Sequence, residues 1–380
     1  MPETVMIVTG ETSGELYGSL LATSLKKRIP DMRIIGIGGE KMKEAGVELI
    51  SGIAGAFGLT EAISSLRTLR ETFSRASQTL ITQRPGLLVL IDYPDFNLKL
   101  ASVAKKEKIK ILYYVSPQVW AWRRNRTKKI ARLVDKMAVI LPFEKEIYRD
   151  AGVECEFVGH PVFDEIKNMS INDKASVKEA LGMDRERPLL SLLPGSRPHE
   201  LERLLPLTLE VVRLFKKEFV HFQFCVPLAP NTDLAGHSRI IEELRQEGVV
   251  INKGESLRVL AASDMSVIAS GTATLQAVLL GVPFVVIYKL FPLTYWLGRM
   301  ILRVRHISLV NILSGRQVVR ELLQAEASSE KIIQELRRIM AENTYRKKMI
   351  EAFDEVREMF SAKNASERVA DIAISMAGWK

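Results

Sequence analysis

Residues 87–97 read LLVLIDYPDFN, an apolar run followed at once by a polar turn that contains proline. The run has no alternation of apolar and polar residues, which is typical of a strand covered on both faces of a parallel sheet. Similar runs, separated by amphipathic stretches, lie at 5–8, 33–37, 109–115 and 136–141. This alternation of strand and helix predicts a doubly wound α/β domain that ends near residue 165.

A second series of apolar runs follows a polar stretch near residues 166–174. Its members lie at 189–193, 221–226, 249–251, 265–269 and 284–288. They predict a second parallel α/β domain over residues 170–350. Asn364 and Glu367 have the form of a capping box ahead of apolar residues at helical spacing. We expect this C-terminal helix, about 355–380, to pack on the first domain, residues 1–165.

Composition excludes several classes of protein. The chain has 380 residues, 47% of them hydrophobic, two cysteines and a formal charge of +9. Two cysteines cannot build a disulfide framework or a multi-cysteine zinc site, which favours a reducing compartment. We find neither the basic start of a signal peptide nor an apolar run of roughly 18 residues, as a spanning helix needs. The positive charge favours an anionic partner, with nucleic acid, anionic lipid and sugar phosphates all open.

The first strand runs into the turn TGETSGE, residues 9–15, which includes Ser13 and Gly14. Glycines and hydroxyls here lie at the carboxyl edge of the sheet, where open α/β sheets bind ligands. The spacing is not G-x-G-x-x-G, and Glu11 and Glu15 would repel a pyrophosphate, so a dinucleotide fingerprint is not indicated. A capped tight turn without a ligand is the alternative.

Two carboxylates follow the strand at 87–91. Asp92 and Asp95 lie three residues apart at the same sheet edge, a suitable place for a general base that acts on a sugar hydroxyl. We expect Asp95 to cap the next helix, because it immediately precedes helical residues. Asp92 is therefore the candidate base.

A dense aromatic and basic segment follows the strand at 109–115. Its members are Trp120, Trp122, Arg123, Arg124, Arg126, Lys128 and Lys129. Amphipathic aromatics beside cations suit a phosphate-bearing lipid or a membrane interface. A solvated basic helix and a nucleic-acid surface are the alternatives.

Two similar turns follow strands of the second domain. LPGSR, residues 193–197, brings backbone amides and Arg197 to a helix start, where they could hold a diphosphate. Ser270, Gly271 and Thr272 open another helix, whose N-terminus carries partial positive charge. Together the turns predict a nucleotide diphosphate site, with packing of small residues as the alternative. His160 and His199 are expected to be structural, and no metal-binding spacing is present.

As an ordered set, these motifs resemble the lipid-A-disaccharide synthase family. The set also includes YVSPQVWAW at 114–122, LPFE at 141–144, VGHP at 158–161 and NILSGR at 311–316. Each motif is weak alone, but their order along nearly the whole chain is specific. The resemblance implies a GT-B architecture, with two Rossmann-like parallel-sheet domains facing a central cleft.

The resemblance also implies a reaction and its participants. A 2,3-diacylglucosamine unit passes from UDP-2,3-diacylglucosamine to 2,3-diacylglucosamine 1-phosphate, with inversion and release of UDP, without a metal or cofactor. Asp92 is then the base. The donor contacts would be Ser13, Gly14, Arg197, Ser270, Gly271, Thr272, Gln276 and Asn311.

The acyl chains of both substrates imply a peripheral protein at an anionic membrane surface, on the cytoplasmic side of the inner membrane of a Gram-negative-type bacterium. Arg299, Arg303 and Arg305, the aromatic and basic segment, and the apolar residues 53–66 are the candidates for this surface. No nucleic acid is expected. The family also implies that two copies can associate as a homodimer.

The sequence departs from the family pattern at four positions. Gln276 replaces an expected glutamate, Glu15 an aspartate, Tyr93 a small residue and Val310 a proline. Two rival functions remain: another UDP-sugar GT-B enzyme, such as a 2-epimerase or a transferase for a different lipid acceptor, and a non-catalytic basic binding protein.

Overall fold

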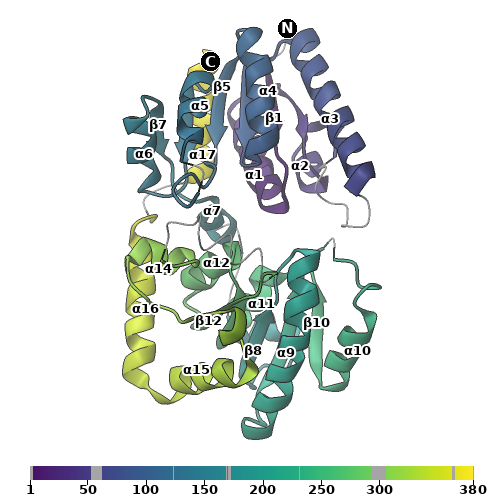
Figure 1. Ribbon diagram of the computed structural model, residues 1–380, viewed down its shortest axis with the longest axis vertical. Coiled ribbons are helices and arrows are strands. Elements are labelled where there is room, and N and C mark those ends of the chain that lie inside the picture. Colours follow the sequence, from purple (N-terminus) through teal and green to yellow (C-terminus); the bar gives the residue numbers. More distant parts are fainter. Residues whose placement is uncertain are drawn as a thin grey trace. The chain divides into compact units, whose positions relative to one another are not determined.

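The computed structural model describes residues 3–52, 62–122, 124–167, 169, 173–230, 232–291, 305–361 and 364–379, without the side chains of Thr12 and of residues 62–66. The chain forms two compact units (Figure 1). The first comprises Met1–Glu165 with Ala362–Lys380, and the second is Ile166–Ser361. Each unit has its own parallel sheet with helices on both faces.

The first unit is built on a seven-stranded sheet in the order β3-β2-β1-β4-β5-β6-β7. All its strand pairs are parallel. The strands are β1 Thr4–Val8, β2 Arg33–Ile37, β3 Glu48–Ser51, β4 Leu87–Ile91, β5 Lys110–Tyr114, β6 Lys136–Val139 and β7 Glu154–Phe157. The central strand β4 is completely buried. Its apolar side chains therefore pack on helices at both faces, as the uninterrupted run predicts.

The helices of this unit alternate with its strands. They are α1 Thr12–Arg28, α2 Glu40–Glu44, α3 Ala62–Gln83, α4 Pro94–Lys106, α5 Arg126–Leu133, α6 Glu144–Asp150, α7 Pro161–Lys167 and α17 Ala365–Ala377. One core cluster joins β-strand residues such as Met6 and Leu90 to Leu100 of α4 and Ile130 of α5. The α7 helix runs past the end of the unit at Glu165.

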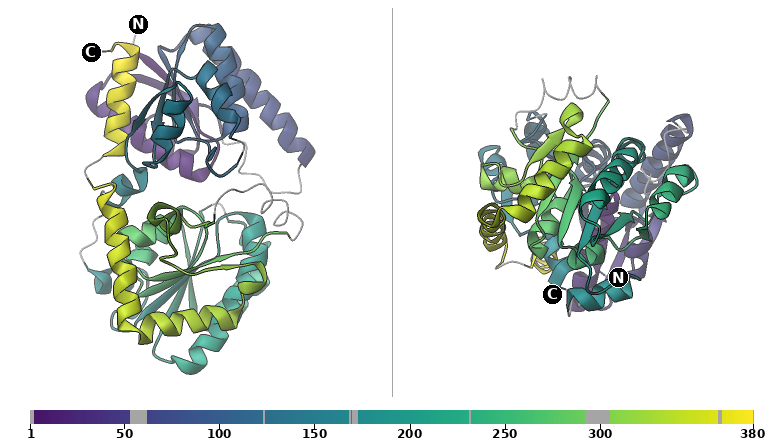
Figure 2. Two further views of the ribbon diagram at one scale, coloured as in Figure 1. Left: turned by 60° about the vertical axis from the view of Figure 1, so that its left-hand side comes forward. Right: turned by 90° about the horizontal axis from the view of Figure 1, so that it is seen from below.

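The C-terminal helix α17 packs on α1, β4 and β5, although it is distant from them in sequence (Figure 2). Asp164, which is 4% exposed, accepts hydrogen bonds from the Ser366 amide at 2.7 Å and the Ser366 hydroxyl at 2.7 Å. A carboxylate at a helix N-terminus is favoured by both hydrogen bonding and the helix dipole. Asp164 therefore anchors the start of α17 to the first unit.

The second unit has a six-stranded sheet in the order β10-β9-β8-β11-β12-β13, again entirely parallel. Its strands are β8 Leu189–Leu193, β9 Gln223–Leu228, β10 Val249–Lys253, β11 Met265–Ala269, β12 Phe284–Tyr288 and β13 Glu321–Leu323. The described helices are α8 Lys174–Ala180, α9 Pro198–Glu218, α10 Ser238–Gln246, α11 Ser256–Ala262, α12 Thr272–Leu280, α14 Leu309–Ser314, α15 Ser329–Ala341 and α16 Asn343–Glu358. The prediction of two parallel α/β domains is thus confirmed.

The C-terminal region differs from the expected single helix over about 355–380. It contains two helices, α16 and α17, which belong to different units. The α16 helix packs on α12 and α14 in the second unit. Its Arg357 donates a hydrogen bond to the Val278 carbonyl at 3.1 Å, close to the end of α12.

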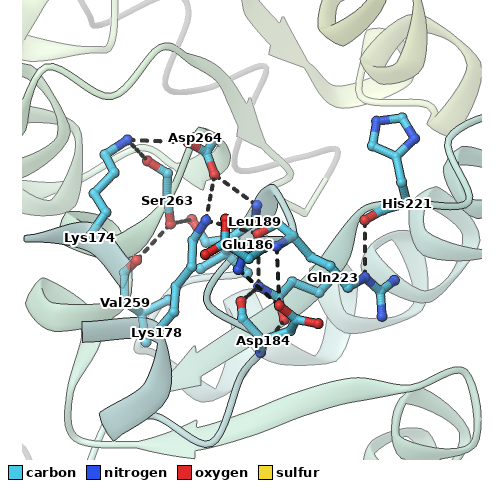
Figure 3. Close-up of polar contacts among 12 residues, drawn as sticks. Lys174, Lys178, Asp184, Glu186, Leu189, His221, Gln223, Val259, Ser263 and Asp264 are labelled. Carbon is cyan, nitrogen blue, oxygen red and sulfur yellow. Dashed lines mark hydrogen bonds and ion pairs between the residues drawn. The ribbon is translucent and has the colours of Figure 1, made fainter. Parts of the chain in front are cut away.

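A polar network ties α8 to the amino ends of β8 and β11 (Figure 3). The Asp264 carboxylate accepts from the Leu189 amide at 2.9 Å and from Nζ of Lys178 at 3.1 Å. Nζ of Lys174 lies 3.4 Å from the other oxygen of this carboxylate, Oδ1. Burial alone would raise the pKa of Asp264, but these donors and cations hold it below its usual value.

We predict that Asp264→Ala destabilises the second unit by about 3 kcal/mol, because it leaves the Lys178 ammonium, whose side chain is 6% exposed, without its carboxylate. Hydrogen–deuterium exchange of the β8 and β11 amides at increasing urea concentration measures the free energy of unfolding of the second unit separately from that of the first. The matched control is Glu247→Ala, which removes a carboxylate paired with Arg213, a side chain 47% exposed, and should cost about 1 kcal/mol or less. Equal effects of the two substitutions would contradict the assigned role of Asp264.

Candidate active site

Asp92 lies at the carboxyl end of β4, the central strand of the first sheet. It is half-buried, and its backbone has a φ of 47°, in the left-handed region that non-glycine residues rarely adopt. Tyr93 follows with a φ of 45°. The chain therefore turns sharply at the residue that the sequence identifies as the candidate base.

Asp95 does not have the capping role expected from the sequence. The α4 helix begins at Pro94 with Tyr93 at the N-cap position, and Asp95 lies in the first turn. Its carboxylate instead pairs with Arg126 of α5. The Arg126 guanidinium also lies over the Trp122 ring, 5.3 Å from its centroid. Asp95 thus connects α4 to the basic segment.

The residues of the basic segment differ in their exposure to solvent. The Arg126 side chain is only 13% exposed, whereas Arg124, Lys128 and Lys129 are exposed and Trp122 is 37% exposed. Arg123, Arg299, Arg303 and residues 53–61 of the apolar segment lie outside the described residues. The exposed cations and Trp122 are the part available to an anionic partner.

Trp120 is fixed by a buried carboxyl group. Its Nε1–H donates to Glu144 Oε1 at 3.2 Å, and the Leu141 amide donates to Glu144 Oε2 at 3.1 Å. Glu144 follows β6 and is 2% exposed. Burial raises the pKa of Glu144 to about 8, against the opposing effect of its donors. The carboxyl group is consequently protonated at neutral pH.

The turn after β1 places Ser13 and Gly14 in the first turn of α1. Glu15 points to another helix: its Oε1 accepts from the Lys41 amide at 2.9 Å, at the start of α2. Gly39 is closely packed against the same carboxylate. Glu15 is therefore a structural cap, and its charge is directed at a helix N-terminus.

The turn after β8 differs from the expected diphosphate cradle. The Ser196 and Arg197 amides donate to Glu200 Oε2, at 3.0 and 3.2 Å. Glu200 is 4% exposed, and Gly195, with a φ of 105°, has no room for a side chain beside it. These two amides are therefore occupied by the chain's own carboxylate. The exposed Arg197 guanidinium lies 3.6 Å from the other Glu200 oxygen, so an anion bound by Arg197 would compete with Glu200.

The turn after β11 retains an accessible helix start. Gly271 precedes α12 in an extended conformation and, as the N-cap residue, has no side chain to cap the helix. A Cβ at Gly271 would meet no described atom within 4 Å. Ser270 Oγ donates to the Ile307 carbonyl at 3.1 Å, which joins the turn to the segment before α14. The first amides of α12, next to Thr272, are the positive end of its dipole. Gln276, further along the same helix, is 8% exposed.

Asn311 does not have the geometry expected of a donor contact. It is completely buried, and its Oδ1 accepts from the Val318 and Val319 amides at 2.7 and 3.0 Å. Its Nδ2 donates to the Val319 carbonyl at 2.9 Å and to Glu321 Oε1 at 2.8 Å. All its amide hydrogen-bonding groups are used within the second unit. Asn311 therefore holds α14 to residues 318–321.

Glu321, which the sequence analysis did not select, organises the same region. Its carboxylate accepts from the Ile307 amide at 3.0 Å and from the Ser308 amide and hydroxyl at 3.0 and 2.9 Å. Because Ser270 bonds to the Ile307 carbonyl, Glu321 also fixes the turn after β11. Glu321 is the first residue of the short strand β13, and the neighbouring sequence does not indicate this role.

His160 is 3% exposed, burial lowers its pKa to about 3, and its Nδ1 accepts from the Val162 amide at 3.2 Å. Its role in the described fold is structural. Across the described part of the chain, no group of three or more His, Cys, Asp or Glu side chains is placed to hold a metal ion. Among the described helices, none is both long and apolar enough to cross a membrane.

Comparison with known families is decisive, because the family model described as lipid-A-disaccharide synthetase matches residues 5–373. The chain belongs to the lipid-A-disaccharide synthetase family. A lipid-A-disaccharide synthase of Syntrophus aciditrophicus is 42% identical over 98% of this chain and 97% of its own length. One from Geobacter metallireducens is 41% identical over 99% and 98%.

Solved structures support the same fold at much lower sequence identity. A UDP-GlcNAc 2-epimerase from Neisseria meningitidis, bound to UDP-GlcNAc, superposes with a TM-score of 0.65 at 13% identity, over 95% of this chain and 100% of the epimerase. The glycotransferase of kitacinnamycin gives a TM-score of 0.64 at 14% identity, with 99% of both chains covered. Such distant likeness shows the GT-B type of fold alone. The family assignment makes this chain a glycosyltransferase of lipid A biosynthesis, which excludes the epimerase and the non-catalytic binding protein.

Glu144 predicts a pH dependence of stability. Its pKa is raised in the folded chain, so its favourable contribution is fully present below the ordinary carboxyl pKa and is lost as the pH rises to about 8. The free energy of unfolding of the wild type should fall by up to about 1.4 kcal/mol per pH unit across this window, relative to that of Glu144→Gln. Unfolding by urea from pH 5 to pH 8 measures the difference. Glu146→Gln, an exposed change in the same helix, is the control, and parallel curves for wild type and Glu144→Gln would contradict the prediction.

Proposed function

We propose that this glycosyltransferase transfers 2,3-diacylglucosamine from UDP-2,3-diacylglucosamine to 2,3-diacylglucosamine 1-phosphate. The products are the β-1,6-linked lipid A disaccharide 1-phosphate and UDP. The observation that carries the proposal is the family match across residues 5–373, which includes both sheet edges that bear the candidate site residues. An α-linked donor and a β-linked product require inversion, so the reaction is a single displacement without a covalent intermediate.

In this mechanism the first unit supplies the base. Asp92 takes the proton from the 6-hydroxyl of the acceptor as the oxygen attacks the anomeric carbon of the donor. Its place at the end of the buried strand β4 supports the assignment, because the strand fixes its position while the side chain stays half-buried. Ser13 and Gly14, which follow the neighbouring strand β1, would contact the donor sugar.

The second unit holds the leaving group. The diphosphate of UDP gains negative charge as the glycosidic bond breaks, and preorganised positive groups lower the free energy of that transition state. The N-terminus of α12, at Ser270, Gly271 and Thr272, and the Arg197 guanidinium supply the positive charge. Glu200 occupies the amides at 196 and 197, so Arg197 contributes through its side chain. Gln276 would accept from the ribose hydroxyls.

The first unit also meets the membrane in this proposal. Arg124, Lys128 and Lys129 are exposed beside Trp122, a combination that binds anionic lipid surfaces. The protein would lie on the cytoplasmic face of the inner membrane, where Trp120 and the basic segment receive the acylated acceptor.

The reaction itself tests the proposal. Wild type should form disaccharide 1-phosphate and UDP from the two substrates, and the new linkage should be β by NMR. Asp92→Asn should lower kcat by about 10²- to 10⁴-fold, because it removes the base. Asp95→Asn, three residues away, weakens the ion pair of an exposed carboxylate with Arg126 and should change kcat by less than about fivefold. Absence of disaccharide with wild type would contradict the function, and full activity of Asp92→Asn would contradict the base.

Charge reversal tests the membrane surface. Lys128→Glu with Lys129→Glu should weaken binding to vesicles that contain anionic lipid by at least about thirtyfold, at roughly 1 kcal/mol for each lysine. Lys216→Glu with Lys217→Glu, an adjacent exposed pair in α9, changes the net charge equally and is the control. Equal weakening by both pairs, or binding that is indifferent to salt, would exclude a local electrostatic anchor.

A further inference from the structure

The ends of β4 and β5 contain an unusual concentration of backbone strain. Asp92, Tyr93 and Val115 have φ values of 47°, 45° and 63°, all in the left-handed region although none is glycine. Such residues cost free energy and persist only where the surrounding structure holds them. Two of the three are adjacent, at the candidate base itself. Contacts around this turn must therefore hold it in place.

The Asp92 carbonyl oxygen is held by two donors. The Tyr113 hydroxyl donates to it at 2.6 Å, and Asn97 Nδ2 donates to it at 2.7 Å. Asn97 Nδ2 also donates to the Ile91 carbonyl at 3.2 Å. Both donor residues are completely buried. The strained peptide is therefore fixed from the neighbouring strand β5 and from the first turns of α4.

The other side of the turn is closed by packing. The Tyr93 ring lies against Gly10, where a Cβ would overlap it, and stacks on Phe96 with centroids 5.4 Å apart. Gly10 belongs to the turn after β1, next to β4 in the sheet. The absence of a side chain at Gly10 thus lets the Tyr93 ring occupy its position. The turn cannot relax toward β1 without losing this contact.

Tyr113 is well suited to be a permanent donor. Its hydroxyl lies in the apolar core of the first unit, where an unused hydroxyl would be costly. Burial, and after it the nearby Asp92 carboxylate, raise the pKa of Tyr113 well above its ordinary value. The phenol keeps its proton throughout the working pH range, so the hydrogen bond to Asp92 is always available.

We propose that Tyr113 is a positioning residue for the transfer reaction: its hydrogen bond to the Asp92 carbonyl oxygen fixes the strained turn, and thereby the direction in which the Asp92 carboxylate leaves the sheet edge. This inference rests on the proposed function, in which Asp92 removes the acceptor proton. Tyr113 acts through the backbone of Asp92 and takes no part in proton transfer.

The sequence context offers a matched pair of variants. Tyr113 and Tyr114 are adjacent, completely buried tyrosines of β5 whose side chains leave opposite faces of the sheet. Tyr113 is near Asp92, whereas Tyr114 is near Asp164 and Tyr17. Tyr113→Phe and Tyr114→Phe each remove one buried hydroxyl, but only the first removes a hydrogen bond to the base residue.

The test is steady-state kinetics of the full chain with both substrates. Tyr113→Phe should lower kcat about tenfold with little change in the KM of either substrate, because a misdirected base reduces the fraction of productive complexes. Tyr114→Phe should retain wild-type kcat. In the Asp92→Asn background, the further substitution Tyr113→Phe should have no additional effect, since the positioned group is gone.

Three results would overturn the inference. The first is a wild-type kcat for Tyr113→Phe. The second is a loss of kcat that is as large when Tyr113→Phe is added to Asp92→Asn as when it is added to wild type, because the hydroxyl would then act on the fold in general. Full activity of Asp92→Asn alone is the third, and it identifies failure of the proposed base as the cause.

If Tyr113→Phe does not fold, Gly10→Ala tests the same turn from its other side. The new methyl group must displace the Tyr93 ring and with it the strained peptide that Tyr113 holds, so kcat should fall. Unchanged kcat for Gly10→Ala would overturn the inference, because the geometry of the turn would then not matter.

Discussion

Burial of both faces of two parallel sheets is the constraint on which the rest of this structure depends. Strands such as β4, β8 and β11 are apolar at every position, or carry only hydroxyls that bond to one another, as Ser191 and Ser266 do. Charged chemistry can appear only where strands end. Because the strands of each sheet are parallel, their carboxyl ends meet at one edge, and turns distant in sequence become neighbours.

The two edges meet this constraint in different ways. At the first edge, strain is concentrated at Asp92, and buried donors hold the peptide in place. At the second edge, the Glu200 carboxylate accepts from the amides of its own turn, and the Glu321 carboxylate accepts from amides of the segment before α14. Among the described residues of this edge, the positive groups near these turns are the Arg197 guanidinium, which also pairs with Glu200, and the start of α12. A transfer reaction needs both a base in a fixed orientation and a positively charged binding site for the leaving group.

The sequence predicted the central strands and the edge strand β10, but it missed the other three edge strands. Runs such as Leu87–Ile91 are apolar because helices cover both faces. The strands β3, β7 and β13, which lie at the sheet edges, are partly exposed and show no such run. Asp92 could be selected because it directly follows a buried strand.

The partners of site residues could not be predicted, because they depend on contacts distant in sequence or on competition between acceptors. Asp95 lies near a helix start, yet it pairs with Arg126 from another helix. Asn311 has a side chain that could contact a ligand, yet its amide group already forms hydrogen bonds within the chain. Glu200 occupies amides that a phosphate could equally have bound. Sequence spacing alone does not rank these alternatives.

The division of roles between the two units is the central claim, and hydrogen–deuterium exchange with and without UDP tests it most directly. UDP alone should slow exchange of amides in residues 269–276, at the turn before α12 and its first turns. It should leave residues 92–97 of the first unit unchanged. Protection confined to 92–97, with none at 269–276, would contradict the assignment of the diphosphate to the second unit.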